Sequence, residues 1–402
     1  MMELLHKFVS APADFLVSYL LPFVVVLSVL VFVHEWGHYI VARLCGVRIK
    51  VFSIGFGPEI FGRTDRAGTR WKFSWIPLGG YVQMFGDVDP TSARHADEVR
   101  DPDLGRALTE EEKKVAFYTQ PVAQRAAIVF AGPAINFIFA ILIMAGMFMA
   151  QGQPYTPPVV GKLVAGSPAE KAGIKPDDKV ISMDGTPIVR FQDMVLYTSV
   201  HMHQEIAVEI AHYKGDKTWS DKTRIVKVTP AIITETDRFG FKSQRGRLGI
   251  MSPAGVHEMQ SHTPISAMTS AVVEVWNISS NTLQALWQII SGTRSTDELG
   301  GILRIGAYAG DFAKEGIVSL VMFAALLSVN LGLLNLFPIP MLDGGHLMFY
   351  AMETVKGKPM SERFQEYALR VGLVLLLGIM LFATWNDLVQ LKVIDYVKSL
   401  VS

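Results

Sequence analysis

The chain has 402 residues, of which 37 are Lys or Arg and 37 are Asp or Glu, so its formal net charge is zero and no basic excess is present to neutralise nucleic-acid phosphates. Charged residues make up only 18% of the chain and the mean hydropathy is +0.31, a composition typical of a membrane protein. A single cysteine, Cys45, excludes an intramolecular disulfide and a zinc site built of cysteines alone.

Four long stretches are almost free of charge and predict transmembrane helices: 15–33, 126–150, 317–342 and 368–386. About 20 apolar residues are enough to cross a hydrocarbon core of roughly 30 Å. Eleven Lys and Arg residues flank one set of span ends and six flank the other. The positive-inside rule therefore places 43–125 and 343–370 in the cytosol, and both termini and 151–316 outside.

The segments between the spans differ in character. Residues 51–61 and 71–84 are rich in glycine and aromatic residues and predict strands, and residues 87–114 are polar and charged. After a proline-rich linker at 153–158, short β-branched runs at 159–164, 179–183, 206–212 and 223–228 surround a helical stretch at 191–203, which predicts a small mixed domain. Apolar residues at helical spacing over 264–290 predict an amphipathic helix against this domain or the membrane surface.

The first span ends in His34-Glu35-Trp36-Gly37-His38. Two histidines four residues apart lie on one face of a helix and can bind one metal ion, and the glutamate between them is suited to act as a general base. The alternative is that these polar residues only mark the end of the span. Residues 39–42 continue the apolar pattern beyond the motif, and ionisable groups in a membrane are costly. The motif therefore favours a metal site.

A hydrolytic zinc site uses three protein ligands and an open position. Pro338 and Pro340 interrupt the third span, and broken backbone at membrane depth is tolerated only where protein or a polar cavity surrounds it. Asp343 directly follows this break and is the preferred third ligand, and His346 is the competing one. The remaining interpretation is that 343–345 form only the turn by which the span leaves the membrane.

These motifs resemble the site-2 protease family, in the bacterial branch typified by the regulator of sigma-E protease. The resemblance rests on four spans in matching order and on the motifs His34-Glu35-Trp36-Gly37-His38, Gly55-Phe56-Gly57-Pro58, Pro77-Leu78-Gly79-Gly80-Tyr81-Val82, Gly132-Pro133-Ala134-Ile135-Asn136 and Asn335…Pro338…Pro340…Leu342-Asp343-Gly344. It implies Zn2+ held by His34, His38 and Asp343, with Glu35 as the base. It also implies that membrane-associated β-loops hold the substrate extended, with substrate contacts from Asn335, Pro338, Pro340, Gly79, Gly80 and Tyr81. For Asn136 a hydrogen bond to another helix and a role in the site are equally open.

The outer segment resembles a PDZ module through residues 166–176 and 181–185, and one such module fits the available length. The fold class expected is a polytopic α-helical membrane protein with four spans, β-loops and one extracytoplasmic PDZ domain. The expected divisions are 1–42 for the first span, 43–125 for the cytosolic loop, 126–150 for the second span, 157–252 for the PDZ domain, 253–316 for outer helices, 317–346 for the third span and 367–388 for the fourth.

The leading functional hypothesis is an intramembrane zinc endopeptidase of the bacterial inner membrane that cleaves transmembrane segments of single-pass proteins. By resemblance, the substrates are anti-sigma factors already trimmed by another protease, or signal-peptide remnants, and the lipid bilayer is the other partner. Two alternatives are a membrane-bound zinc protease of loop or soluble substrates, and a metal-binding transporter or PDZ scaffold that uses the broken third span. A transporter needs metal ligands but no poised general base, so Glu35 between two histidines argues against it.

Overall fold

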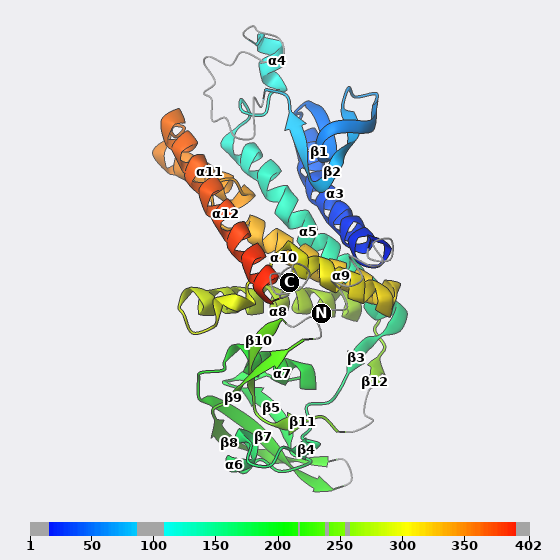
Figure 1. The fold of residues 1–402 in the computed structure, drawn as a ribbon, viewed down its shortest axis with the longest axis vertical. Helices are drawn as coiled ribbons and strands as arrows, with labels where there is room; N and C mark the ends of the chain where they lie inside the picture. The colour runs from blue at the N-terminus through cyan, green and yellow to red at the C-terminus, as the bar shows by residue number, and fades with distance from the viewer. Residues whose placement is uncertain (1–15, 87–107, 216–217, 238–240, 254–257, 391–402) are drawn as a thin grey trace, which may run out of the picture. The chain divides into compact units, whose positions relative to one another are not determined.

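The computed structural model describes residues 16–86, 108–215, 218–237, 241–253 and 258–390 (Figure 1). Residues 87–107, most of the polar and charged stretch noted above, lie outside this part of the chain. The chain divides into two compact units, each treated by itself below. The helical unit contains the residues up to Ile143 together with Gly300–Trp385, and the β-rich unit contains Met144–Leu299 and the residues from Asn386 on.

Four helices among the described residues are long and apolar enough to cross a membrane, as the sequence predicts. They cover Leu16–Leu44 (a π-helical turn, η1, Leu16–Leu20, and α3, Leu21–Leu44), Val122–Gln151 (α5), Ile317–Asn335 (α10) and Arg363–Gln390 (most of α12, Glu362–Gln390). In the most apolar window of each, only 17% to 44% of the residues are buried. Their exposed faces are therefore apolar, as lipid contact requires.

The third span breaks where the prolines predict. Helix α10 ends at Asn335, and α11, Asp343–Lys356, begins at Asp343 after seven non-helical residues. Pro338 has no N–H to donate and disfavours helical geometry in the residue before it, so the helix cannot continue through this segment. The chain then folds back closely, because a Cβ on Gly344 would lie 2.3 Å from the Leu336 carbonyl oxygen.

Shorter helices complete the helical unit. Helix α9, Ile302–Glu315, packs Ala309 against Phe23 of α3 and Phe323 of α10. Helix α4, Glu110–Lys114, begins with a capping box in which Thr109 and Glu112 each accept a hydrogen bond from the other's backbone N–H.

The predicted strand-like segments of the helical unit form one antiparallel sheet from two long strands, β1 (Ile49–Thr64) and β2 (Arg70–Met84). Each strand pairs twice, so the segments lie in the order 80–84, 49–54, 70–73 and 59–64. The segment 80–84 is thus an outer edge of this sheet. Helix α3 packs against the sheet, with Phe32 and Tyr39 against the ring of Phe52.

The β-rich unit is built around one four-stranded sheet in the order β6-β5-β7-β8. Its elements are β3 (Gln153–Tyr155), β4 (Lys162–Leu163), α6 (Pro168–Lys171), β5 (Lys179–Met183), β6 (Thr186–Pro187), α7 (Phe191–Val200), β7 (Ile206–Gly215), β8 (Thr218–Val228), β9 (Ala231–Thr236), β10 (Lys242–Arg247), β11 (Ile250–Met251), β12 (Glu258–Gln260), α8 (Pro264–Ile290) and a 3-10 turn, η2 (Thr296–Glu298). Two-stranded ladders join β3 to β12, β4 to β11 and β9 to β10. The core is formed by Val160, Val180, Met183, Ile206, Val208 and Ile210.

The predicted strands at 179–183, 206–212 and 223–228 and the predicted helices at 191–203 and 264–290 are present as β5, β7, β8, α7 and α8. Of the predicted run 159–164 only Lys162–Leu163 forms a strand, and the sequence did not predict the hairpin β9–β10 or the short elements β3, α6, β6, β11, β12 and η2. The shortness of strand β4 is explained by Gly161, where the chain runs as irregular backbone: a Cβ at this position would lie 2.6 Å from the backbone of Ser252. Helix α8 buries Ala267, Ala271 and Val275 and leaves an opposite apolar face exposed.

Candidate metal centre

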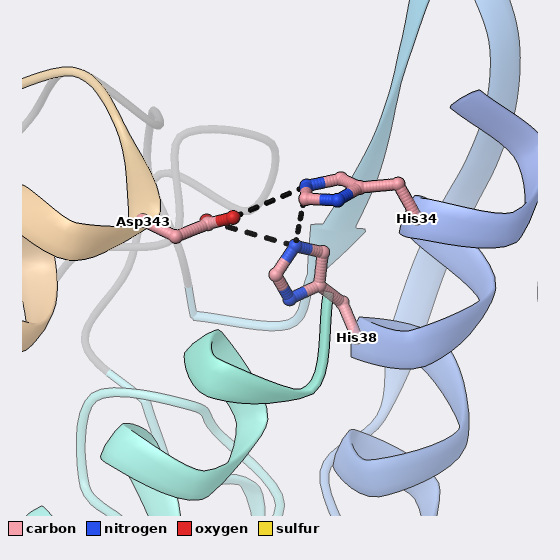
Figure 2. A group of neighbouring side chains, drawn as sticks. All are labelled: His34, His38 and Asp343. Carbon is pink, nitrogen blue, oxygen red and sulfur yellow. Dashed lines mark hydrogen bonds and ion pairs between the residues drawn. The ribbon is translucent and has the colours of Figure 1, made fainter. Parts of the chain in front are cut away.

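The three predicted metal ligands come together in the helical unit. His34 and His38 lie one turn apart on α3 with their Nε2 atoms 3.3 Å apart, and Asp343 at the start of α11 faces both rings (Figure 2). Asp343 Oδ2 lies 3.1 Å from His34 Nε2, and Oδ1 lies 3.6 Å from His38 Nε2. The competing candidate His346 is not part of this cluster.

The spacing of these donor atoms fits a zinc ion. Zinc binds histidine nitrogen and carboxylate oxygen at about 2.0–2.2 Å in a tetrahedron, which places neighbouring donors about 3.3–3.5 Å apart. The two Nε2 atoms are 3.3 Å apart, and each has its own nearest oxygen of the Asp343 carboxylate, Oδ2 at 3.1 Å for His34 and Oδ1 at 3.6 Å for His38. Asp343 Oδ2 is also buried without a hydrogen bond, although it contacts His34 as an ion pair. A buried carboxylate oxygen without a donor is suited to a cation.

Helix α5 lies against the two histidines and contacts the Nδ1 atom of each ring. His38 Nδ1 lies 2.9 Å from the carbonyl oxygen of Ile128, and His34 Nδ1 lies 3.0 Å from the side-chain amide of Asn136. Gly132 lies between these two positions, and a Cβ there would stand 2.2 Å from His38 Nε2. A residue larger than glycine would therefore occupy the space of the rings themselves.

For Asn136 the sequence left two roles open, a hydrogen bond to another helix and a role in the site. Its contact with His34 on α3 fulfils both. It missed the Ile128 carbonyl, because a backbone acceptor has no sequence signature. The four-residue spacing of Gly132 and Asn136 on one helical face was the signal that could have indicated Gly132.

Glu35 is half buried beside the outer strand of the sheet. The backbone N–H of Val82 donates to its carboxylate, and a Cβ on Gly80 would stand 3.3 Å from Glu35 Cγ. The predicted substrate-binding residue Gly80 is therefore a direct neighbour of the predicted base. Gly79 lies against the ring of Phe56, which also stacks on Tyr81.

The other predicted substrate-binding residues lie on the broken segment before Asp343. Asn335 is the last residue of α10, and Pro338 and Pro340 lie in the loop that leads to α11. Gly372 of α12 packs against this loop, since its Cβ would approach the Pro340 carbonyl oxygen to 2.1 Å. The loop is thus held from behind by the fourth span.

An ion pair joins α11 to α5 at the far end of α11. Arg125 donates to Glu353 over 2.7 Å, both side chains are 13–14% exposed, and the Arg125 guanidinium lies 4.9 Å from the centre of the Tyr350 ring. Because Asp343 begins α11 and Ile128 and Asn136 lie on α5, this contact helps to fix the third ligand relative to the other two.

Comparison with known proteins agrees with this site. Residues 22–379 match peptidase family M50. The chain belongs to that family. It is 40% identical over 385 residues to an Agrobacterium fabrum protein named "putative zinc metalloprotease", covering 95% of this chain and 99% of the relative. It is 42% identical over 376 residues to a Rhizobium meliloti protein of the same description (92% and 96% covered), and 37% identical over 393 residues to metalloprotease MmpA of Caulobacter vibrioides (93% and 96% covered).

These findings confirm the predicted resemblance to the site-2 proteases. Family membership together with a cluster of three metal-binding side chains identifies the chain as a zinc metalloprotease. The four apolar helices make it a membrane protein of this class.

Proposed function

We propose that the chain is an intramembrane zinc endopeptidase that cleaves transmembrane segments of single-pass membrane proteins. The observation that carries the proposal is the depth of the cluster: His34 lies within the apolar helix Leu16–Leu44, and thirteen residues of regular helix, about 20 Å, separate it from Leu21. A peptide bond must enter the membrane to reach such a site. We further propose that the membrane is a bacterial inner membrane, and the distribution of Lys and Arg supports a site in its cytosolic half with 151–316 outside.

The roles proposed for the residues follow from the geometry. His34, His38 and Asp343 hold the zinc ion, which when bound supplies Lewis-acid activation of water and of the scissile carbonyl. Glu35 takes up a proton from the attacking water and delivers it to the leaving nitrogen, as a carboxylate next to a metal site does. The Val82 N–H orients this carboxylate.

The outer strand of the sheet is proposed to hold the substrate. A helical peptide bond is shielded by its own hydrogen bonds, so the substrate must be extended before it is cut, and an exposed strand edge can pair with it. Alternate residues of a strand direct their backbone groups to the same edge, so Gly80 shares with Val82 the edge that faces Glu35. Gly79, Tyr81, Asn335, Pro338 and Pro340 are proposed to line the rest of the path.

The proposal is tested with the variant Glu35→Gln and a transmembrane reporter. Glu35→Gln should keep its zinc and lose cleavage, whereas Asp343→Ala should lose zinc and His346→Ala should not. A reporter whose span contains Gly, Ser or Asn should be cleaved faster than an all-Leu span, because it unwinds more easily. Cleavage of a reporter only when its cut site is moved into a soluble loop would instead support a membrane-bound protease of loop substrates.

For residues 157–252 we propose a PDZ module that screens substrates, such as anti-sigma factors, by the size of their outer part. Supporting this, the unit has a cleft of about 320 Å3 between α7 and the segment 245–252, whose lining combines apolar side chains such as Met194, Val195 and Leu248 with the charged side chains of Glu235, Arg245 and Arg247. A cleft of mixed polarity between a helix and an extended segment suits an extended peptide. Deletion of 160–250 should allow substrates with an untrimmed outer domain to be cut. Rejection of such a substrate by a stably inserted, zinc-loaded deletion variant would exclude screening.

A further inference from the structure

Three residues of α5 meet the two histidines in succession. Ile128, Gly132 and Asn136 are spaced four apart and so lie along one face of the helix. The Ile128 carbonyl contacts His38, the Gly132 backbone lies against both rings, and the Asn136 side chain contacts His34. This face therefore serves the ligand pair as a whole, one helical turn for each contact.

The contact at His38 fixes the position of its proton. A carbonyl oxygen can only accept, so the 2.9 Å contact requires that His38 Nδ1 carries the hydrogen and donates it to Ile128. A neutral imidazole has one N–H, which leaves the lone pair on Nε2, the atom that faces Asp343. His38 is thus preset to bind a metal through Nε2.

His34 needs the same arrangement, and its Nδ1 faces Asn136. The amide of Asn136 is fully buried, its Nδ2 lies 3.0 Å from His34 Nδ1, and its Oδ1 has no hydrogen-bond partner. Rotating the Asn136 amide by half a turn about its Cβ–Cγ bond exchanges Oδ1 and Nδ2. Asn136 Oδ1 then accepts a hydrogen bond from His34 Nδ1–H. The same half-turn leaves the lone pair of His34 on Nε2.

We propose that Asn136 is a positioning residue for zinc: its Oδ1 accepts the Nδ1–H of His34 and thereby sets the tautomer in which Nε2 binds the metal. Hydrogen-bonded partners of this kind orient histidine ligands and raise their basicity. The proposal rests on the ligand role of His34 and not on where the substrate is cut.

A purely structural role for Asn136 makes a different prediction. The packing of α5 against α10 uses the backbone of Asn136, whose carbonyl oxygen accepts from Ser328 Oγ over 2.9 Å, and the close approach of Gly332. Those contacts do not involve the side-chain amide. If the amide only fills space, an apolar side chain of similar volume should replace it without effect on the metal.

The test is the zinc dissociation constant of the full-length protein in detergent, measured by competition with a chromogenic chelator in the absence of substrate. Asn136→Leu should weaken zinc binding about 10- to 100-fold, the usual cost of losing such a partner. Asn136→Asp, whose carboxylate can only accept, should bind zinc at least as tightly as the wild type. Ser328→Ala should leave zinc binding unchanged, and His34→Ala marks the loss of a ligand.

Wild-type zinc affinity in folded Asn136→Leu would overturn the proposal. Asn136→Asp decides the question even if Asn136→Leu does not fold, because an acid that binds zinc as weakly as His34→Ala would show that the amide must donate. Unchanged zinc affinity in His34→Ala would show that His34 is not a zinc ligand, and the role proposed for Asn136 would then also be wrong. None of these results depends on proteolysis, so failure of the intramembrane cleavage assay is a separate outcome.

Discussion

Gly132 offers the sharpest perturbation of the metal centre, because one methyl group there must displace a ligand. In Gly132→Ala the new Cβ would stand 2.2 Å from His38 Nε2, 2.4 Å from His38 Cε1 and 2.9 Å from His34 Cε1. Non-bonded heavy atoms need about 3.5 Å, so the His38 ring must move by about 1.3 Å. Metal–ligand distances tolerate only about 0.2 Å. The hydrogen bond to Ile128 opposes the movement at the other ring nitrogen.

We therefore expect Gly132→Ala to lower both zinc affinity and the rate of reporter cleavage by about 100-fold or more. Gly146→Ala is the matched control, because Gly146 lies on the same helix and its Cβ would meet no atom within 4 Å. Alanine is favoured over glycine in a helix by about 1 kcal/mol, so neither variant should lose stability through the backbone. Zinc content and cleavage are measured on both proteins. Wild-type values for Gly132→Ala would refute the geometry described here.

Two further predictions concern charges and pH. Arg125→Met should lower the free energy of unfolding by about 3 kcal/mol, because it leaves Glu353, only 13% exposed, without its partner. The double variant Arg125→Met/Glu353→Met should recover most of this loss in thermal unfolding in detergent, and an equal loss in both variants would show that the unpaired charge of Glu353 is not its cause. Burial and a hydrogen bond to Asp184 raise the pKa of Tyr197 to about 12, so this phenol stabilises the fold below its ordinary pKa of 10.0 and the effect is lost as pH rises toward 12. An ultraviolet titration of the wild type against Tyr197→Phe measures this group, and a Tyr197 that ionises near 10 would contradict the prediction.

Local sequence signals account for the parts of the site that depend on one segment. The two histidines share a face of α3 because their spacing matches the helical period, and α10 ends before Pro338 because proline cannot continue a helix. The preference for Asp343 over His346 followed from its place directly after the break, and the cluster contains Asp343. The resemblance to the zinc-protease family also rests on these local motifs, and the family match confirms it.

Contacts between distant segments could not be predicted in this way. Arg125 and Glu353 are 228 residues apart, and their pairing depends on how α5 and α11 pack. The hairpin β9–β10 was missed for a different reason. Its second strand, Lys242–Arg247, is polar apart from Gly246, which is also its one buried residue, so it lacks the alternation of apolar residues on which strand prediction depends.

The close packing of α3 and α5 connects membrane folding with the chemistry of the site. Helices in lipid gain little from apolar contact alone and approach closely where small residues allow it. Gly37 and Gly132 provide this approach, since a Cβ on Gly37 would stand 2.3 Å from the Ala131 carbonyl oxygen. The same approach brings the acceptor of His38 and the amide beside His34 within 2.9 and 3.0 Å of their rings. A side chain that separates the two helices by even 1 Å would lengthen both contacts beyond hydrogen-bonding distance, so helix packing and the orientation of the ligands depend on the same glycines.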